Sequence, residues 1–186
     1  MIIGIGSGRC GTQSLARLLN EQPGQRVTHE QLGDQVPWGD AIGYSGTLKG
    51  DGDVAFYWLP AVRRLLKTDM ASRIICLKRP MGPTVDSYLR KTDGFNPWQD
   101  SGARWSKCYP HYPPDISKRT AVERYWHDYY GTAQVLEADF PERFRVFPTD
   151  YLNHTQRQRE LLLFAGVPVQ EQRLDVGIRR NVGAPT

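Results

Sequence analysis

Residues 2–20 read IIGIGSGRCGTQSLARLLN and pass from an apolar run through a glycine-rich turn into a segment with helical periodicity. The apolar run is long enough for a short buried strand, and Leu15, Leu18 and Leu19 recur at the spacing of one helix face. A strand, a glycine loop and a helix N-terminus together form an anion site, because backbone N–H groups converge there. Arg9 lies within this loop, where its guanidinium would face the anion. The stretch therefore predicts a phosphate-like ligand.

Three interpretations of this loop compete. Residues 6–11 fit the dinucleotide-binding pattern G-x-G-x-x-G, and Glu30 follows at about the spacing of a ribose-binding carboxylate. The same residues fit the frame of a Walker A loop, but Thr12 stands where that loop needs its lysine. The third interpretation rests on residues 9–12, in which a cation precedes a small residue, a glycine and a threonine. A single glycine pattern is weak evidence, so the rest of the chain has to decide.

Size and composition predict one globular domain. The chain has 186 residues, of which 24% are charged and 39% hydrophobic, and this is typical of a soluble protein with a substantial core. The net charge of +4 favours anionic ligands, but no long Lys/Arg run is present. We therefore expect a single domain over residues 1–186 and no nucleic-acid partner.

The cysteines and the apolar segments bear on location. Cys10, Cys76 and Cys108 are few, odd in number and widely spaced, so they provide neither a disulfide framework nor a metal-ligand spacing. The N-terminal residues lack the basic and long apolar regions of a signal peptide, and no stretch approaches the roughly 18 apolar residues of a membrane span. These features predict a cytoplasmic protein without a membrane span, and they leave its oligomeric state open.

Strand-like and helix-like segments alternate along the chain. The expected strands cover residues 2–6, 25–30, 53–58, 73–78 and 143–147, and the clearest helices cover about 120–138 and 156–165. This alternation predicts a three-layer α/β/α fold with a central parallel sheet, in which the apolar 73–78 segment is a central strand. Two segments rich in glycine, proline or aromatic residues, at about 31–52 and 92–118, are expected to be loop insertions that shape a pocket.

Polar side chains cluster at the predicted strand ends. The glycine loop, His29-Glu30, Trp58-Leu59 and Arg79 each follow or end a predicted strand. Because ligands of parallel sheets bind at the carboxyl ends of the strands, we expect these segments to share one site.

A second anion-binding pattern follows the 73–78 strand. Arg79 comes directly after this strand, and Ser87 lies about two helical turns further on, so the two side chains could grip one dianion. Together with residues 9–12, this arrangement resembles the two phosphate motifs of sulfotransferases that use 3′-phosphoadenosine 5′-phosphosulfate (PAPS). The pair is more specific than either motif alone, and residues 147–152 also look like compact bacterial members. The family fold, a P-loop nucleotide-kinase-like parallel sheet, agrees with the predicted elements.

The resemblance implies a set of donor-binding residues. Arg9 would neutralise charge on the transferring group, and it stands where many members carry lysine. Cys10 takes a position that is often serine. The backbone N–H groups of residues 10–13 would cradle the 5′-phosphate, and no metal is required. The implied binding residues are Gly8, Arg9, Cys10, Gly11, Thr12, Gln13, Arg79 and Ser87.

The same resemblance implies sulfuryl transfer to an acceptor hydroxyl or amine, which needs a general base. Glu30 and His29 are the candidates, and strand alternation predicts that only one of them faces the reacting group. Glu30 is favoured, because family branches with arginine in the loop tend to carry glutamate here. Arg179 and Arg180 would either join the 3′-phosphate site or lie in solvent.

The acceptor is expected to be a small molecule or a carbohydrate. Two other functions stay open at this point: a P-loop-type nucleotide-binding kinase and a non-catalytic dinucleotide-binding module.

Overall fold

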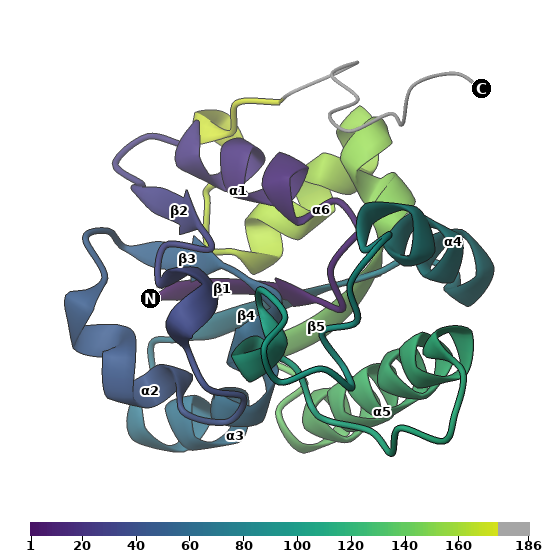
Figure 1. Ribbon diagram of the computed structural model, residues 1–186. Coiled ribbons are helices and arrows are strands. Elements are labelled where there is room, and N and C mark those ends of the chain that lie inside the picture. Colours follow the sequence, from purple (N-terminus) through teal and green to yellow (C-terminus); the bar gives the residue numbers. More distant parts are fainter. Residues whose placement is uncertain (175–186) are drawn as a thin grey trace.

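The computed structural model describes residues 1–174 and contains one parallel sheet with the strand order β2-β3-β1-β4-β5 (Figure 1). All four pairings between neighbouring strands are parallel. This architecture confirms the predicted α/β class with a central parallel sheet. The strands are β1 (Ile2–Gly6), β2 (Val27–His29), β3 (Gly52–Val54), β4 (Arg73–Lys78) and β5 (Phe144–Pro148).

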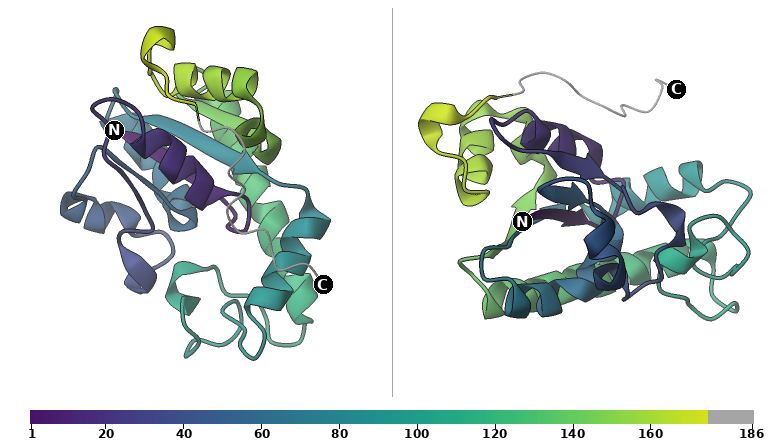
Figure 2. Two further views of the ribbon diagram at one scale, coloured as in Figure 1. Left: turned by 90° about the horizontal axis from the view of Figure 1, so that it is seen from above. Right: turned by 90° about the vertical axis from the view of Figure 1, so that its left-hand side faces the viewer.

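Helices cover both faces of the sheet (Figures 1 and 2). One face carries α1 (Thr12–Asn20) and α6 (Thr155–Phe164), and the other carries α2 (Ala41–Tyr44), α3 (Leu59–Thr68) and α5 (Lys118–Asp139). The remaining helix, α4 (Met81–Lys91), follows β4 and packs against α5. Among residues 1–174, no helix combines the length and apolar character that a bilayer crossing requires.

Strand β4 shows how the sequence builds two cores. Ile74 and Cys76 pack into the core beneath α3 and α5, while Ile75 and Leu77 pack into the core beneath α1 and α6. All four side chains are fully buried, and β4 pairs with β1 on one side and β5 on the other. The prediction of a central strand at residues 73–78 is therefore confirmed, because a strand covered on both faces needs an apolar run.

The prediction of a strand over residues 53–58 is wrong in its second half. Strand β3 ends at Val54, and residues 56–58 form a 3₁₀ turn. The Tyr57 hydroxyl and Trp58 Nε1 both donate to the buried Asp53 carboxylate, at 3.2 and 2.9 Å, and so fold the chain back on itself. Trp58 is consequently part of the core rather than of the strand-end site. A short apolar run is compatible with either structure.

The glycines of β1 are required by close packing. A Cβ on Gly4 would lie 2.7 Å from Val54 Cγ2 and 2.9 Å from a Leu15 methyl group. A Cβ on Gly6 would lie 2.4 Å from Cys10 Sγ and 2.8 Å from the carbonyl oxygen of Leu77. Strand β1 thus lets the loop that follows it fold back closely over its neighbour β4.

We predict that Gly6→Ala lowers the free energy of unfolding by about 2 kcal/mol, because part of the clash is with backbone that cannot move aside. Gly131→Ala is the matched control, since nothing lies within 4 Å of a Cβ at Gly131 in α5. That variant should be stabilised by up to about 1 kcal/mol through helix propensity. Urea unfolding of both variants measures the difference, and equal unfolding midpoints would contradict the packing role of Gly6.

Candidate functional site

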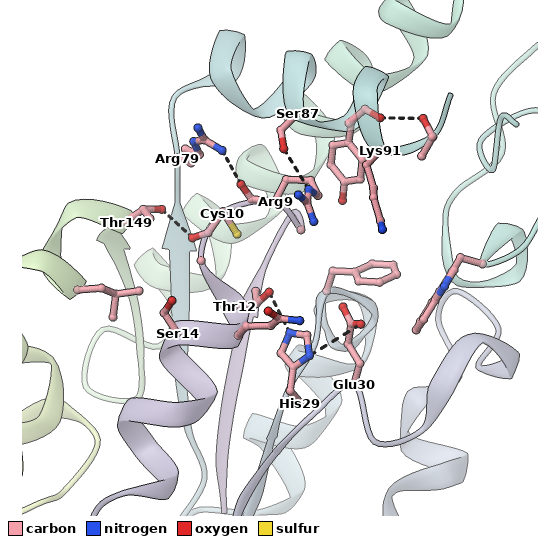
Figure 3. A pocket seen from close by; sticks show the side chains of 18 of the residues that line it. Arg9, Cys10, Thr12, Ser14, His29, Glu30, Arg79, Ser87, Lys91 and Thr149 are labelled. Carbon is pink, nitrogen blue, oxygen red and sulfur yellow. Dashed lines mark hydrogen bonds and ion pairs between the residues drawn. The ribbon is translucent and has the colours of Figure 1, made fainter. Parts of the chain in front are cut away.

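A cavity of about 770 Å³ opens at the carboxyl ends of the strands (Figure 3). Its walls come from the loop after β1, the end of β2, α4, the 92–118 segment and the chain after β5. Arg179 and Arg180 lie outside the described residues. Trp58 and Leu59, which were expected at the site, do not line this cavity. The predicted catalytic and donor-binding residues do line it: Gly8, Arg9, Cys10, Gly11, Thr12, Gln13, His29, Glu30, Arg79 and Ser87.

Three side chains hold the loop after β1 by donating hydrogen bonds to its backbone carbonyl groups. The Tyr88 hydroxyl donates to the carbonyl of Ser7, Arg79 Nη1 donates to that of Arg9 at 3.0 Å, and Thr149 Oγ1 donates to that of Cys10 at 2.9 Å. These three side chains come from α4, the end of β4 and the turn after β5. Segments distant in the sequence therefore fix one short loop.

Several backbone N–H groups of the same loop are available to bind an anion. Gly8, Arg9 and Gly11 have positive φ angles of 83°, 53° and 91°, and Gly11 is the N-cap of α1 without a side-chain cap. The N–H groups of Arg9, Gly11 and Thr12 have no acceptor within residues 1–174. Unpaired donors at a helix N-terminus carry partial positive charge and bind anions.

Two further tyrosines form hydrogen bonds with the backbone where the loop begins. Tyr129 Oη accepts from the N–H of Gly6 at 3.1 Å, and Tyr130 Oη accepts from the N–H of Ser7 at 3.3 Å. Both tyrosines are buried on α5, and their hydroxyls also donate to backbone carbonyls at 3.0 and 2.8 Å. The sequence analysis did not identify these residues, since their spacing on a helix indicates only a buried face.

The two predicted anion motifs meet through Arg9. Its backbone carbonyl accepts from Arg79, and its Nε donates to Ser87 Oγ at 3.1 Å. Lys91, which the sequence analysis also missed, lies one turn beyond Ser87 on α4 and reaches into the same cavity (Figure 3). Its position four residues after Ser87 was the available signal, because such residues share one helix face.

His29 and Glu30 both line the cavity, and which of them faces the reacting group stays a prediction. Strand β2 ends at His29, and Glu30 adopts a left-handed φ of 51°, which breaks the alternation of a strand. His29 Nδ1 lies 3.9 Å from Glu30 Oε2, and His29 Nε2 lies 3.1 Å from Thr12 Oγ1. Burial lowers the pKa of His29, so this imidazole is neutral near pH 7.

Glu30 has the titration range of a general base. Its pKa is raised from 4.5 to about 7, mainly by burial and also by the negative charge of Asp53, while Arg9 acts in the opposite direction. Proton transfer is most efficient when the pKa of the base lies near the working pH. Glu30 is therefore suited to accept a proton at neutral pH.

Asp53 holds the chain around the end of β2 in place by hydrogen bonds. It is fully buried and accepts hydrogen bonds from Thr28 Oγ1 at 2.7 Å, from the N–H of Gln31 at 3.3 Å and from two aromatic side chains of the following turn. It thereby holds the backbone on both sides of Glu30. An acid inside an otherwise apolar segment was the signal for this role.

Backbone strain is concentrated around the cavity. Within residues 1–174, the non-glycine residues with positive φ are Arg9, Glu30 and Trp105, and all three line it. Each such residue costs of order 1–3 kcal/mol and persists only where surrounding contacts hold it. Such a concentration is typical of binding and catalytic sites.

Cys10 contributes backbone rather than a nucleophile. Burial raises the pKa of its thiol to about 11, and its Sγ occupies the space that a Cβ on Gly6 would take. A thiol in this setting stays protonated and inert. Among residues 1–174, no cluster of three or more His, Cys, Asp or Glu side chains is arranged to hold a metal ion.

Comparison with known proteins supports the fold. No protein-family model matches the chain, and no curated protein matches it. The crystal structure of a sulfotransferase from Alicyclobacillus acidocaldarius matches with a TM-score of 0.60 and 14% sequence identity, over 97% of this chain and 86% of that one. At this level of identity the two chains share a fold, and a shared fold does not establish a shared activity.

The raised pKa of Glu30 predicts a pH-dependent stability. The folded carboxyl holds its proton more tightly than the unfolded one, so the wild-type protein loses stability as the pH rises from 4.5 through about 7. Glu30→Gln removes this loss and should be more stable than wild type by roughly 2 kcal/mol at pH 8.5, with little difference at pH 4. Thermal unfolding of both proteins across this range tests it; a constant difference would show that the Glu30 proton is not involved.

Proposed function

We propose that this protein is a sulfotransferase that transfers a sulfuryl group from PAPS to an acceptor hydroxyl or amine. One observation carries the proposal: Arg79 and Ser87 both contact Arg9, so two anion-binding groups face one cavity beside the N-terminus of α1. PAPS carries a phosphosulfate at one end and a 3′-phosphate at the other. The likeness in fold to a solved sulfotransferase supports the same assignment.

The loop after β1 suits the 5′-phosphosulfate. Within residues 1–174 the N–H groups of Arg9, Gly11 and Thr12 lack acceptors, and Arg9 and Thr12 line the same cavity. In this assignment the N–H groups bind the phosphate oxygens, and Arg9 balances the charge that develops as the sulfuryl group leaves. Sulfuryl transfer resembles phosphoryl transfer, in which the protein contributes mainly positioning and charge stabilisation.

Arg79 and Ser87 suit the 3′-phosphate. Arg79 donates to the Arg9 carbonyl through Nη1, which leaves further guanidinium donors for an anion. Ser87 presents its hydroxyl from the facing helix, α4. A grip of this kind would distinguish PAPS from nucleotides without a 3′-phosphate, because only PAPS would gain these charge-assisted hydrogen bonds.

Glu30 is the proposed general base, with His29 as its neighbour. Glu30 has a carboxyl whose pKa is about 7, and it lies across the cavity from Arg9 and Lys91 (Figure 3). The neutral His29 ring lies 3.1 Å from the Thr12 hydroxyl and orients it. Glu30 would therefore take the proton of the acceptor, and His29 would support the donor loop.

The proposal predicts that the protein binds 3′,5′-adenosine bisphosphate more tightly than ATP with magnesium or NAD. The two competing functions predict otherwise, since a kinase binds ATP and a dinucleotide module binds NAD. Thermal shift with each ligand at equal concentration provides the ranking. Stabilisation by ATP or NAD, without stabilisation by the bisphosphate, would exclude the proposed function.

Arg79→Ala tests which end of the donor is held by Arg79. Loss of a charge-assisted bond to the 3′-phosphate should weaken the bisphosphate by about ten-fold or more. Adenosine 5′-phosphosulfate lacks that phosphate and should be affected much less. Equal weakening of both ligands would instead indicate that Arg79 acts only through the loop, by its contact with the Arg9 carbonyl.

Glu30→Gln should reduce kcat by about 10²–10⁴-fold and leave the affinity for the bisphosphate nearly unchanged. In the wild-type protein, kcat/KM should fall as the pH drops below about 7, because the base becomes protonated. Transfer assays with labelled PAPS across pH 5–9 measure both effects. His29→Asn is the matched control: if that variant loses turnover and Glu30→Gln keeps it, the base is His29.

A further inference from the structure

The cavity extends past the donor loop to an aromatic wall. Phe56 and Tyr109 stack with ring centroids 4.4 Å apart and an interplanar angle of 14°, and Trp105 lies against Phe56 at a centroid distance of 6.0 Å. All three line the cavity, and Phe56 and Tyr109 are buried. Trp105 is inclined to Phe56 by 54° and is the partly exposed member of the three, so it gives the cavity an aromatic surface for a ring of a ligand.

Lys91 enters the same part of the cavity from the opposite side. It is the last residue of α4, and its side chain points toward the space above Glu30 (Figure 3). No carboxylate among residues 1–174 pairs with its ammonium. Lys91 is exposed, so its ammonium is solvated, and it is available to pair with an anionic group that a ligand brings into the cavity.

The other cations of the cavity already have assignments. Arg9 and Arg79 lie at the donor loop, and Arg104 donates to Asp34 Oδ2 at 3.1 Å. Lys91 is left as the cation on the acceptor side. The ionisable groups with a formal charge that line the cavity are Arg9, Arg79, Lys91, Arg104 and the single carboxylate Glu30.

The position of Lys91 at the end of α4 does not by itself account for its place in the cavity. Cations in the last turn of a helix interact favourably with the helix dipole, and both Arg90 and Lys91 lie in the last turn of α4. Arg90 does not line the cavity, whereas Lys91 does. The two neighbours thus share the helix-end effect and differ in their access to the cavity.

We propose that Lys91 binds an anionic group of the acceptor, a carboxylate or a sulfate ester, and so selects for acidic acceptors. A ring of the acceptor lies against Trp105, and its hydroxyl lies at Glu30. This inference rests on the proposed function, and it adds the chemical class of the acceptor: a hydroxylated ring with a negatively charged substituent.

The test uses two matched pairs of probes, each differing in one charge. They are 4-nitrophenyl β-glucuronide with the β-glucoside, and 4-hydroxybenzoate with its methyl ester. Affinities are measured by calorimetry on protein saturated with 3′,5′-adenosine bisphosphate, so that no transfer occurs. In at least one pair, the anionic probe should bind about ten-fold more tightly than its neutral partner.

Lys91→Met should abolish that preference, and Arg90→Met should retain it, because only Lys91 reaches the cavity. Absence of a preference in the wild-type protein, or an unchanged preference in Lys91→Met, overturns the inference. So does a loss of affinity for the bisphosphate itself in Lys91→Met, since Lys91 would then bind the donor.

The two levels of the hypothesis fail in different ways. If wild-type protein does not bind the bisphosphate at all, the proposed function is wrong and the inference falls with it. If the bisphosphate binds and no charge preference follows, the role of Lys91 alone is wrong.

Discussion

The candidate site depends on three hydrogen bonds that hold the carbonyl groups of the loop after β1. Tyr88, Arg79 and Thr149 each donate to one carbonyl, and these bonds turn the oxygens of the loop away from the place where an anion would bind. Without them, carbonyl dipoles would face an anion and repel it. The backbone at Gly8 and Arg9 is left-handed, which is costly for arginine and needs this external support.

Arg79 has two roles in this arrangement. Its Nη1 atom fixes the Arg9 carbonyl, and the rest of the guanidinium remains in the cavity. The loop and Arg79, the proposed ligand of the 3′-phosphate, are therefore joined by a hydrogen bond. Ser87 adds a second connection by accepting a hydrogen bond from Arg9 Nε. Hydrogen bonds within the protein, rather than the ligand, set the distance between the loop and Arg79. Binding of a donor would therefore require less ordering of these side chains.

On the opposite wall of the cavity, a buried carboxylate raises the pKa of Glu30. Asp53 is held by four hydrogen bonds beneath the end of β2, and its charge acts on Glu30 without touching the cavity. Burial and this negative charge act in the same direction, and both raise the pKa of Glu30 toward neutral pH.

Much of the fold and of the site was predictable from the sequence, because the decisive features are local. The glycine loop reads directly as a strand-to-helix turn, and the convergence of Arg79 with Arg9 follows from the geometry of parallel strands. The turn at residues 56–58 was missed because a short apolar run fits either a strand or a turn. The left-handed Glu30 was missed because the backbone beside it is held by Asp53, which belongs to another strand. Thr149 and the tyrosines of α5 were missed because their contacts with the loop after β1 join segments distant in the sequence.

The hydrogen bond between Thr149 and the Cys10 carbonyl joins positions 139 residues apart in the chain. The anion site is therefore complete only after β5 has joined the sheet, at the far end from β2. A partly folded chain that has formed β1 and α1 but not β5 would present a glycine loop without its full support. Binding of an anion by this loop is thus coupled to the pairing of β5 with β4, and not only to the local turn between β1 and α1.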